Sequence, residues 1–450
     1  MKGNSRLRQI ITPGLIIMFG LVFAAGAQMQ HPNTTFQPHS EVGRSIDFLW
    51  DRLMLLGTIV FVLVEGALLY VVFRYRSKGN ETTRPPQTHG HAFLEILWTL
   101  IPAFILIFIA VPTVRIIFQT QAKVAAGALQ IEVIGHQWWW EFRYPEYNIT
   151  TANEIYLPVG RTVNFKLNSV DVIHSFWTPQ LGGKRDVIAN RTNYIWYTPD
   201  STMKSAVWNG FCTEYCGTSH AKMRFRVFTV QPAEFASWVA GQQKPAAFGA
   251  VASATAAQAG AEPKTSGIGA EGGNAPAVAR PAGTVTPGSD TIAAPAPSNG
   301  AQLASLPAGY TFPREVAEFD YAKPHTPIPG DLSFTKGLTG SAAKGMQTFS
   351  SSACIGCHMI NGNPSAVGNS GPNLTHIGSR ATLGAGSFPN TPAYLALWIK
   401  NARKMKPGIL MPTLGLNEYD PRQKAQVTKA MGGLDDQQIA DIVAYLSSLK

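Results

Sequence analysis

The chain has 450 residues, with a formal net charge of +10, ten histidines and four cysteines. This length predicts several domains, because one domain usually holds about 100–200 residues. The positive charge could suggest nucleic acid, but no basic stripe with interleaved aromatic residues and no nucleic-acid motif is present. We therefore expect no nucleic-acid partner, and a membrane explains the charge better.

Residues 1–27 have the pattern of a signal peptide. Lys2, Arg6 and Arg8 precede an apolar run from Ile10 to Phe23, and small residues follow up to Ala27. The run is short for a spanning helix, which needs about 20 apolar residues. We expect cleavage near Ala27, and an uncleaved third span is the alternative.

Two longer apolar runs predict a transmembrane helical hairpin over residues 47–119. The runs extend from Leu53 to Phe73 and from Phe93 to Phe118, each long enough to cross the hydrocarbon core. Basic residues gather between them: Arg74, Arg76, Lys78 and Arg84. The positive-inside rule makes that end cytoplasmic, so everything after Gln119 is expected on the opposite side.

Each predicted span contains one carboxylate, and a charge within a membrane is costly unless it faces a partner or water. Glu65 lies deep in the first span and Glu95 near the cytoplasmic end of the second. For Glu65, a structural contact with a neighbouring subunit and a role in transport are equally open.

The remainder of the chain divides into a β domain, a linker and a helical domain. Residues 128–240 alternate in character, as in Val163 to Asn168, and turn residues separate the runs, which predicts an all-β Greek-key barrel or sandwich. Residues 242–307 consist mainly of Ala, Gly, Pro, Ser and Thr, a composition that predicts a disordered tether. Residues 335–450 read as mainly helical, with Thr391 and Pro392 starting one helix.

The densest chemical pattern in the β domain combines two thiols, two imidazoles and a thioether. His174 lies upstream between two predicted strands, and the other four side chains fall within one short run: Cys212, Cys216, His220 and Met223. Soft ligands of this kind select copper, and a weak axial methionine is typical of copper electron-transfer sites. A second cysteine also allows both sulfurs to bridge two ions.

Three alternative roles for the cysteine pair remain open at this point: a Cys212–Cys216 disulfide, a zinc site and a copper chaperone. A disulfide would leave His174, His220 and Met223 without a role. A structural zinc site would not ordinarily use methionine.

The same residues resemble the CuA motif of cytochrome c oxidase subunit II, which has a cupredoxin-like fold, over Asp47 to about Trp238. The resemblance implies a dinuclear copper centre whose ligands also include the backbone carbonyl of Glu214. It further implies a magnesium ion on the Glu214 carboxylate at the boundary with subunit I. Trp138, the first of three tryptophans, would be the entry point for electrons, and Glu95 would mark the entrance of a proton channel in subunit I.

A second metal pattern in the C-terminal domain points to heme c. Cys354, Cys357 and His358 form the attachment sequence, with two thioether links and one axial imidazole. The stretch from Lys406 to Pro412 resembles the loop of class I cytochromes c that presents the distal methionine, which makes Met411 the expected sixth ligand. The rivals are Met359, Met405 and Met431, and His376 is expected to lie behind the ligands or at the surface.

These patterns predict an electron-transfer chain rather than a bond-making enzyme. The resemblance implies subunit II of a caa(3)-type terminal oxidase in the bacterial cytoplasmic membrane, with both metal domains on the periplasmic side. Its partners would be subunit I and subunit III, with a cytochrome c or a quinol-oxidising complex as donor. The alternatives are a CuA-containing subunit of a nitric oxide or nitrous oxide reductase, and a membrane-anchored copper-delivery protein.

Overall fold

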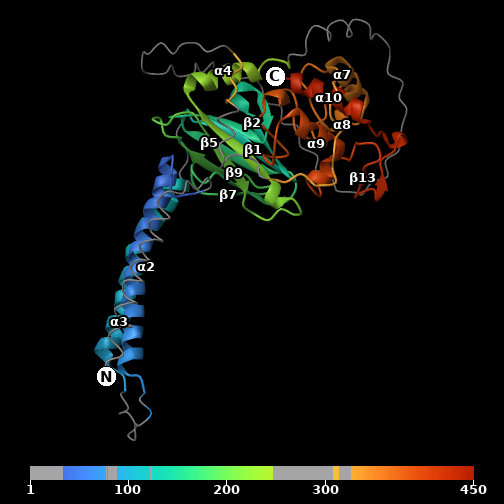
Figure 1. The fold of residues 1–450 in the computed structure, drawn as a ribbon. Helices are drawn as coiled ribbons and strands as arrows, with labels where there is room; N and C mark the ends of the chain where they lie inside the picture. The colour runs from blue at the N-terminus through green and yellow to red at the C-terminus, as the bar shows by residue number, and fades with distance from the viewer. Residues whose placement is uncertain are drawn as a thin grey trace.

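The computed structural model describes residues 34–77, 79, 89–121, 124, 126–246, 308–313 and 326–450. A long helical hairpin leads into a β domain, and a helical domain lies beside the β domain on the side away from the hairpin (Figure 1). The predicted signal peptide lies outside the described residues, as does most of the predicted linker.

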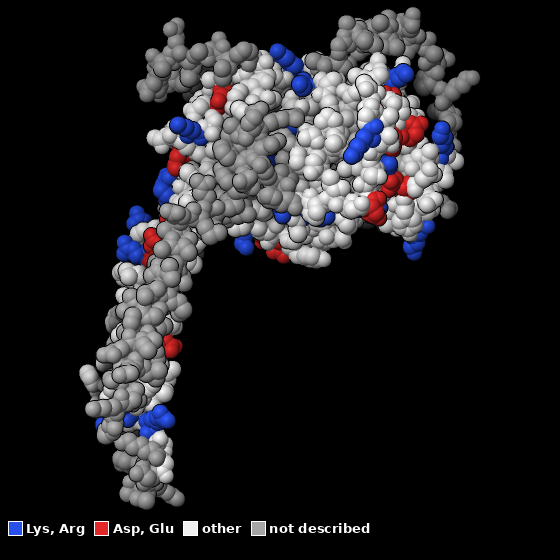
Figure 2. Space-filling view, in the orientation of Figure 1, with Lys and Arg blue, Asp and Glu red and all other residues white. Residues whose placement is uncertain are grey.

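The hairpin consists of α2 (Glu41–Arg74) and α3 (Ala92–Gln121). The side chain of Ser40 caps α2 by accepting a hydrogen bond from the backbone of Gly43. Both helices are long and apolar enough to cross a membrane. Where the hairpin is not covered by grey atoms in Figure 2, its surface is largely white, with basic side chains near its far end and near the β domain. These features agree with the predicted hairpin, and α2 begins at Glu41, well before the predicted start of the first span at Leu53.

The β domain is a sandwich of two five-stranded sheets. Their strand orders are β3-β2-β1-β5-β8 and β4-β10-β9-β6-β7. The strands are β1 (Leu129–His136), β2 (Trp139–Tyr144), β3 (Ile149–Ala152), β4 (Glu154–Pro158), β5 (Val163–Ser169), β6 (His174–Trp177), β7 (Arg185–Val187), β8 (Asn193–Tyr197), β9 (Ala206–Cys212) and β10 (Arg224–Val230). Parallel pairs β1/β5 and β4/β10 within otherwise antiparallel sheets fit the expected cupredoxin-like topology.

Aromatic side chains fill the space between the sheets next to the metal-ligand candidates. Phe176 on β6 stacks on Phe225 of β10 with ring centroids 4.7 Å apart, and Trp140 meets both rings edge-on. All three side chains are buried. Because β6 starts at His174 and β9 ends at Cys212, this packed core fixes two candidate ligands relative to each other.

Two segments of this domain lie beyond the predicted strands. Helix α4 (Pro232–Gln242) follows β10, with proline in its first turn and a capping box between Gln231 and Glu234. Residues 308–313 return to the sandwich, where Phe312 is buried against Phe228. Helix α4 and residues 308–313 therefore pack with the β domain.

The C-terminal domain contains α7 (Ala342–Ser351), α8 (Cys354–Cys357), α9 (Pro392–Met405) and α10 (Asp436–Ser448). Helix α7 crosses α10 closely at Gly345, where an added Cβ would lie 1.9 Å from the backbone oxygen of Asp441. Two short ladders interrupt the expected all-α pattern: β11 (Thr382–Leu383) with β12 (Phe388–Pro389), and β13 (Tyr419–Asp420) with β14 (Ala425–Gln426). Each ladder pairs two short loop segments and does not extend into a larger sheet.

Candidate copper centre and heme cavity

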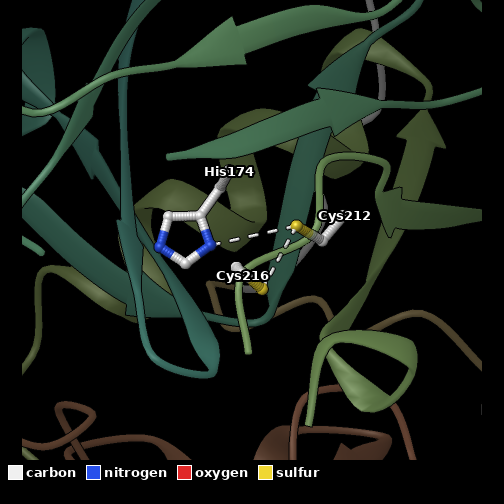
Figure 3. A group of neighbouring side chains, drawn as sticks. All are labelled: His174, Cys212 and Cys216. Atoms are coloured by element: carbon white, nitrogen blue, oxygen red, sulfur yellow. Dashed lines mark hydrogen bonds between the residues drawn. The ribbon is translucent and has the colours of Figure 1, made fainter. Parts of the chain in front are cut away.

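Three candidate copper ligands converge at one end of the sandwich. The Cys212 Sγ lies 3.7 Å from the Cys216 Sγ and 3.8 Å from the His174 Nδ1 (Figure 3). Their ligand atoms all lie within 4.8 Å of one another, and the three side chains are buried. The strand β6 and the end of β9 bring them together from positions 38 residues apart.

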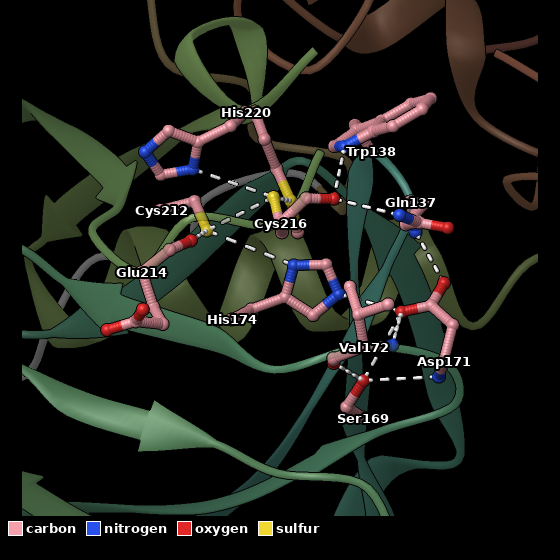
Figure 4. Close-up of polar contacts among 11 residues, drawn as sticks. Gln137, Trp138, Ser169, Asp171, Val172, His174, Cys212, Glu214, Cys216 and His220 are labelled. Carbon is pink, nitrogen blue, oxygen red and sulfur yellow. Dashed lines mark hydrogen bonds and ion pairs between the residues drawn. The ribbon is translucent and has the colours of Figure 1, made fainter. Parts of the chain in front are cut away.

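The other three predicted ligands join this group from the loop after β9. The Cys216 Sγ lies 3.5 Å from the His220 Nδ1 and 3.8 Å from the Met223 Sδ. The backbone oxygen of Glu214 lies 3.3 Å from the Cys212 Sγ, whereas its carboxylate points away from the sulfurs and is exposed (Figure 4). All six donors predicted from the sequence therefore face one small volume.

The distance between the two sulfurs distinguishes a metal site from a disulfide. A disulfide requires about 2.05 Å between the sulfurs, and both cysteines are free. Metal–sulfur bonds are about 2.3 Å long, so sulfurs 3.7 Å apart can both bind one ion and leave room for a second ion on the other side. The donor set of this structure thus fits a bridged pair of copper ions.

The ionisation of the two thiols is linked. The Cys216 thiol, aimed at the Cys212 sulfur, lowers the pKa of Cys212 against the opposing effect of burial, and His174 lowers it further. The same contact, together with burial, raises the pKa of Cys216. One thiolate is therefore readily available, and the second requires the positive charge of bound metal.

Asp171 holds His174 in place and was not identified from the sequence. Its Oδ1 lies 2.8 Å from the His174 Nε2, which leaves Nδ1 directed at Cys212. Its Oδ2 accepts a 2.6 Å hydrogen bond from the backbone of Gln137 (Figure 4). A carboxylate three residues before a candidate histidine ligand was the available signal, since such partners commonly orient a metal-binding imidazole.

A cavity between the C-terminal domain and the β domain contains all four predicted heme-binding side chains in its wall: Cys354, Cys357, His358 and Met411. His358 donates from Nδ1 to the carbonyl of Pro372 at 2.8 Å, which leaves Nε2 free to bind iron. Burial lowers the pKa of His358 and so favours the neutral, metal-binding form. The rest of the lining is largely apolar, including Phe349, Leu395 and Leu446, as suits a porphyrin.

Met411 is the methionine that the structure places in the lining of this cavity, among the residues it describes. Met405 is buried elsewhere in the helical core, and Met359 and Met431 are partly exposed. His376 lies outside the cavity, and its Nε2 is 3.2 Å from the backbone oxygen of Gln242. His376 is buried rather than at the surface.

The three consecutive tryptophans have different surroundings. Trp140 is a core residue and Trp139 stacks on His136 with centroids 4.0 Å apart. Trp138 lines the heme cavity, and its Nε1 donates a 2.8 Å hydrogen bond to the carbonyl of Cys216. Trp138 therefore touches both candidate metal sites.

The two membrane carboxylates lie far from these sites. Glu95 is in the first turn of α3, at the end of the hairpin distant from the β domain, and its carboxylate accepts a hydrogen bond from the backbone of His91. Glu65 lies within α2 and is half-buried.

Comparison with known proteins agrees with this arrangement. Family models match in three places: the transmembrane domain of cytochrome c oxidase subunit II over residues 29–116, its periplasmic domain over 148–230, and cytochrome c over 342–450. The probable cytochrome c oxidase subunit 2 of Rickettsia bellii is 30% identical over 54% of this chain and 96% of its own length. The chain belongs to the cytochrome c oxidase subunit II family.

One further relative covers the C-terminal domain as well, and a solved structure is similar over a smaller part of the chain. Cytochrome c oxidase subunit 2 of Alkalihalophilus pseudofirmus is 28% identical over 97% of this chain and 96% of its own length. The solved periplasmic domain of subunit II from Bradyrhizobium japonicum is 31% identical, covering 27% of this chain and 97% of its own, with a TM-score of 0.25.

Family membership fixes the broad character of the molecule. The chain is part of a heme–copper oxidase complex, and the subunit II family implies an association with subunit I. The subunit II domain implies CuA copper, and the cytochrome c domain implies heme. The hairpin anchors the chain in a membrane, with the β domain outside it.

Proposed function

We propose that electrons from an external donor enter at heme c, pass to a dinuclear CuA centre and continue to heme in subunit I, where oxygen is reduced to water with proton translocation. The observation that supports this order is the position of Trp138, which lines the heme cavity and hydrogen-bonds to the carbonyl of Cys216. The donor would be a cytochrome c or a quinol-oxidising complex.

The copper ions would supply reversible one-electron chemistry, and the chain's role is to restrict the movement of their ligands. Cys212, Cys216, His174, His220, Met223 and the Glu214 carbonyl would hold the pair. Asp171 and the aromatic core hold His174, so little rearrangement is required when an electron arrives. The buried sulfurs also exclude water.

The heme would be attached through Cys354 and Cys357 and ligated by His358 and Met411. The pair of a histidine and a methionine gives a high potential suited to an electron carrier. The hydrogen bond from His358 to Pro372 orients the imidazole, and the apolar lining keeps the site dry.

Further assignments belong to the same proposal. The exposed Glu214 carboxylate would bind magnesium at the boundary with subunit I, and Glu95 would lie at the entrance of a proton channel. The chain would be a multi-pass protein of a bacterial cytoplasmic membrane, associated with subunit III as well as subunit I. Residues 1–27, 47–119, 128–240, 242–307 and 335–450 would be its signal peptide, hairpin, CuA domain, linker and cytochrome domain.

The test is to isolate the chain with its membrane partners and follow oxygen uptake and flash-induced electron transfer. The parent complex should transfer electrons from heme to copper, and Trp138→Phe should slow that step without altering either metal spectrum. Trp208→Phe is the matched control, because Trp208 is equally buried and its Nε1 donates to the Thr229 hydroxyl at 2.9 Å, within the sandwich. Absence of oxygen uptake with a reduced carrier would reject the oxidase role. A parent-like rate of heme-to-copper transfer in Trp138→Phe would reject the route through Trp138.

A further inference from the structure

The cytochrome domain contacts the β domain through the loop that carries Met411. The Ser219 hydroxyl donates to the carbonyl of Pro407 at 2.5 Å, and the Lys222 ammonium donates to the carbonyl of Met405 at 3.1 Å. Gly408, at φ +87°, passes so close to Trp138 that an added Cβ would lie 2.9 Å from the indole ring. The loops holding the two sets of metal ligands are therefore joined directly.

Lys406 occupies the centre of this contact. Its side chain is buried, at 2% exposure, and its Nζ donates to the carbonyl of Trp138 at 2.6 Å and to the carbonyl of Gly384 at 3.1 Å. Burial, with Lys222 nearby, lowers the pKa of Lys406 to about 7. Burying a cation this completely is costly unless its hydrogen bonds are satisfied, so the contact depends on accurate placement of both domains.

Trp138 is consequently held from two sides. Its indole Nε1 is bonded to Cys216 of its own domain, and its backbone carbonyl accepts from Lys406 of the cytochrome domain. A shift of the cytochrome domain would break the second bond while leaving the first in place.

Glu154 makes a second buried contact, which extends from the β domain into the cytochrome domain. It belongs to β4, is 3% exposed, and reaches into the cytochrome domain. Its Oε1 accepts hydrogen bonds from the backbone of Ala381 at 2.9 Å, and from the backbone and hydroxyl of Thr382 at 2.8 and 2.9 Å. Each domain thus contributes one buried ionisable group to a set of hydrogen-bonding partners on the other.

We propose that Lys406 and Glu154 are positioning residues that lock the cytochrome domain onto the CuA domain, with Lys406 fixing Trp138 against the heme cavity. The inference rests on the proposed electron path. It adds that transfer occurs in one docked arrangement, defined by two reciprocal buried contacts. The partner that covers Trp138 is then the chain's own cytochrome domain.

The first experiment compares Lys406→Met with Lys404→Met in the intact complex. Lys404 lies in the last turn of α9, two residues before Lys406, but pairs with the carboxylate of Asp331 at 2.7 Å, within the cytochrome domain. Pulsed electron-spin measurement between ferric heme and the mixed-valence copper pair gives the distribution of distances, and flash photoreduction gives the transfer rate. Losing one partner of a buried charged contact should weaken docking roughly 30-fold or more, which broadens the distances and slows transfer in Lys406→Met alone.

A second pair of variants keeps the test independent of any folding defect at Lys406. Glu154→Gln retains an acceptor oxygen and should keep the parent distances, whereas Glu154→Leu removes it and should broaden them. Unchanged heme and copper spectra confirm that each domain is folded. If Lys406→Met and Glu154→Leu both retain the parent distances and rate, the docking inference is overturned. If the parent itself shows no heme-to-copper transfer, the proposed function fails instead.

Discussion

At the scale of single residues, a change at Met223 tests whether it binds copper while leaving the fold largely intact. Its sulfur lies 3.8 Å from that of Cys216 and the side chain is fully buried. Met223→Leu conserves volume and should cost less than about 1.5 kcal/mol of stability. Because an axial ligand tunes a copper electron-transfer site, the copper absorption and electron-spin spectra should change while the heme spectrum stays the same. An unaltered copper spectrum would contradict the ligand assignment.

Met411 can be tested in the same way against a neighbouring methionine. Met411→Leu should abolish the methionine-to-iron charge-transfer band, because its side chain lines the heme cavity. Met405→Leu is the control, since Met405 is buried in the helical core outside that lining. A band that survives in Met411→Leu would assign the sixth ligand to another residue.

The candidate ligands could be read from the sequence because most of them lie in two short runs, Cys212 to Met223 and Cys354 to His358. The roles of Lys406 and Glu154 at the contact between the domains could not be predicted from the sequence. Each reads as an ordinary polar residue, and its burial follows from contacts with residues 268 and 228 positions away. Burial of this kind is decided by tertiary packing, which no local spacing encodes.

At the scale of elements, the loop carrying Met411 depends on a buried ion pair. Arg403 pairs with Asp420 at 2.5 Å and donates to the carbonyl of Leu410, while Asp420 accepts from the backbone of Thr413. These bonds fix the loop on both sides of Met411.

The pH dependence of this loop follows from Asp420. Burial raises the pKa of Asp420, but the hydrogen bonds from Arg403 and three backbone amides outweigh it and lower the pKa from 3.8 to about 2. A lowered folded-state pKa adds stability above pH 3.8, and this is lost as the pH falls towards 2. The charge-transfer band of the parent should therefore weaken across that range.

Asp420→Asn should lose this stabilisation at neutral pH. Removing one partner of a buried pair costs about 3–5 kcal/mol, so denaturant unfolding followed at the heme should shift by an amount of that order. The acid-dependent loss between pH 4 and 2 should also become shallower. Asp331→Asn, which alters an exposed pair on the same domain, should leave both properties close to the parent. A parent-like acid titration in Asp420→Asn would contradict this role.

Alternation in the sequence predicted strands such as β5 because the sandwich buries one face of that strand, at Val163, Phe165 and Leu167. Helix α4 was not identified, although Pro232 and the Gln231/Glu234 capping box were visible signals. No sequence signal of this kind indicated that residues 308–313 pack on the sandwich. It is stabilised by burial of Phe312 and by a bond from its backbone to the Tyr156 hydroxyl, both of which require the finished domain.

At the scale of the whole molecule, we expect the predicted linker over 242–307 to keep the C-terminal part of the chain close to the β domain, together with residues 308–313, which pack on the sandwich through Phe312. A flexible connection of this kind gives a concentration in the millimolar range. A protease site placed within residues 250–300 allows the connection to be cut after the complex is assembled. Heme-to-copper transfer in the uncut chain should not depend on dilution, because docking is intramolecular.

After cleavage, the C-terminal fragment is held by non-covalent contacts alone, including those of residues 308–313 on the sandwich, so the transferring fraction should fall as the complex is diluted from about 100 to about 1 μM, well below that effective concentration. Added salt should change the result little, because Lys406 and Glu154 are buried and buried charges are weakly screened. The same inserted site without cleavage is the control. Transfer that persists at every dilution after cleavage would mean that these non-covalent contacts keep the two fragments together and that an intact linker is dispensable once the domains have docked.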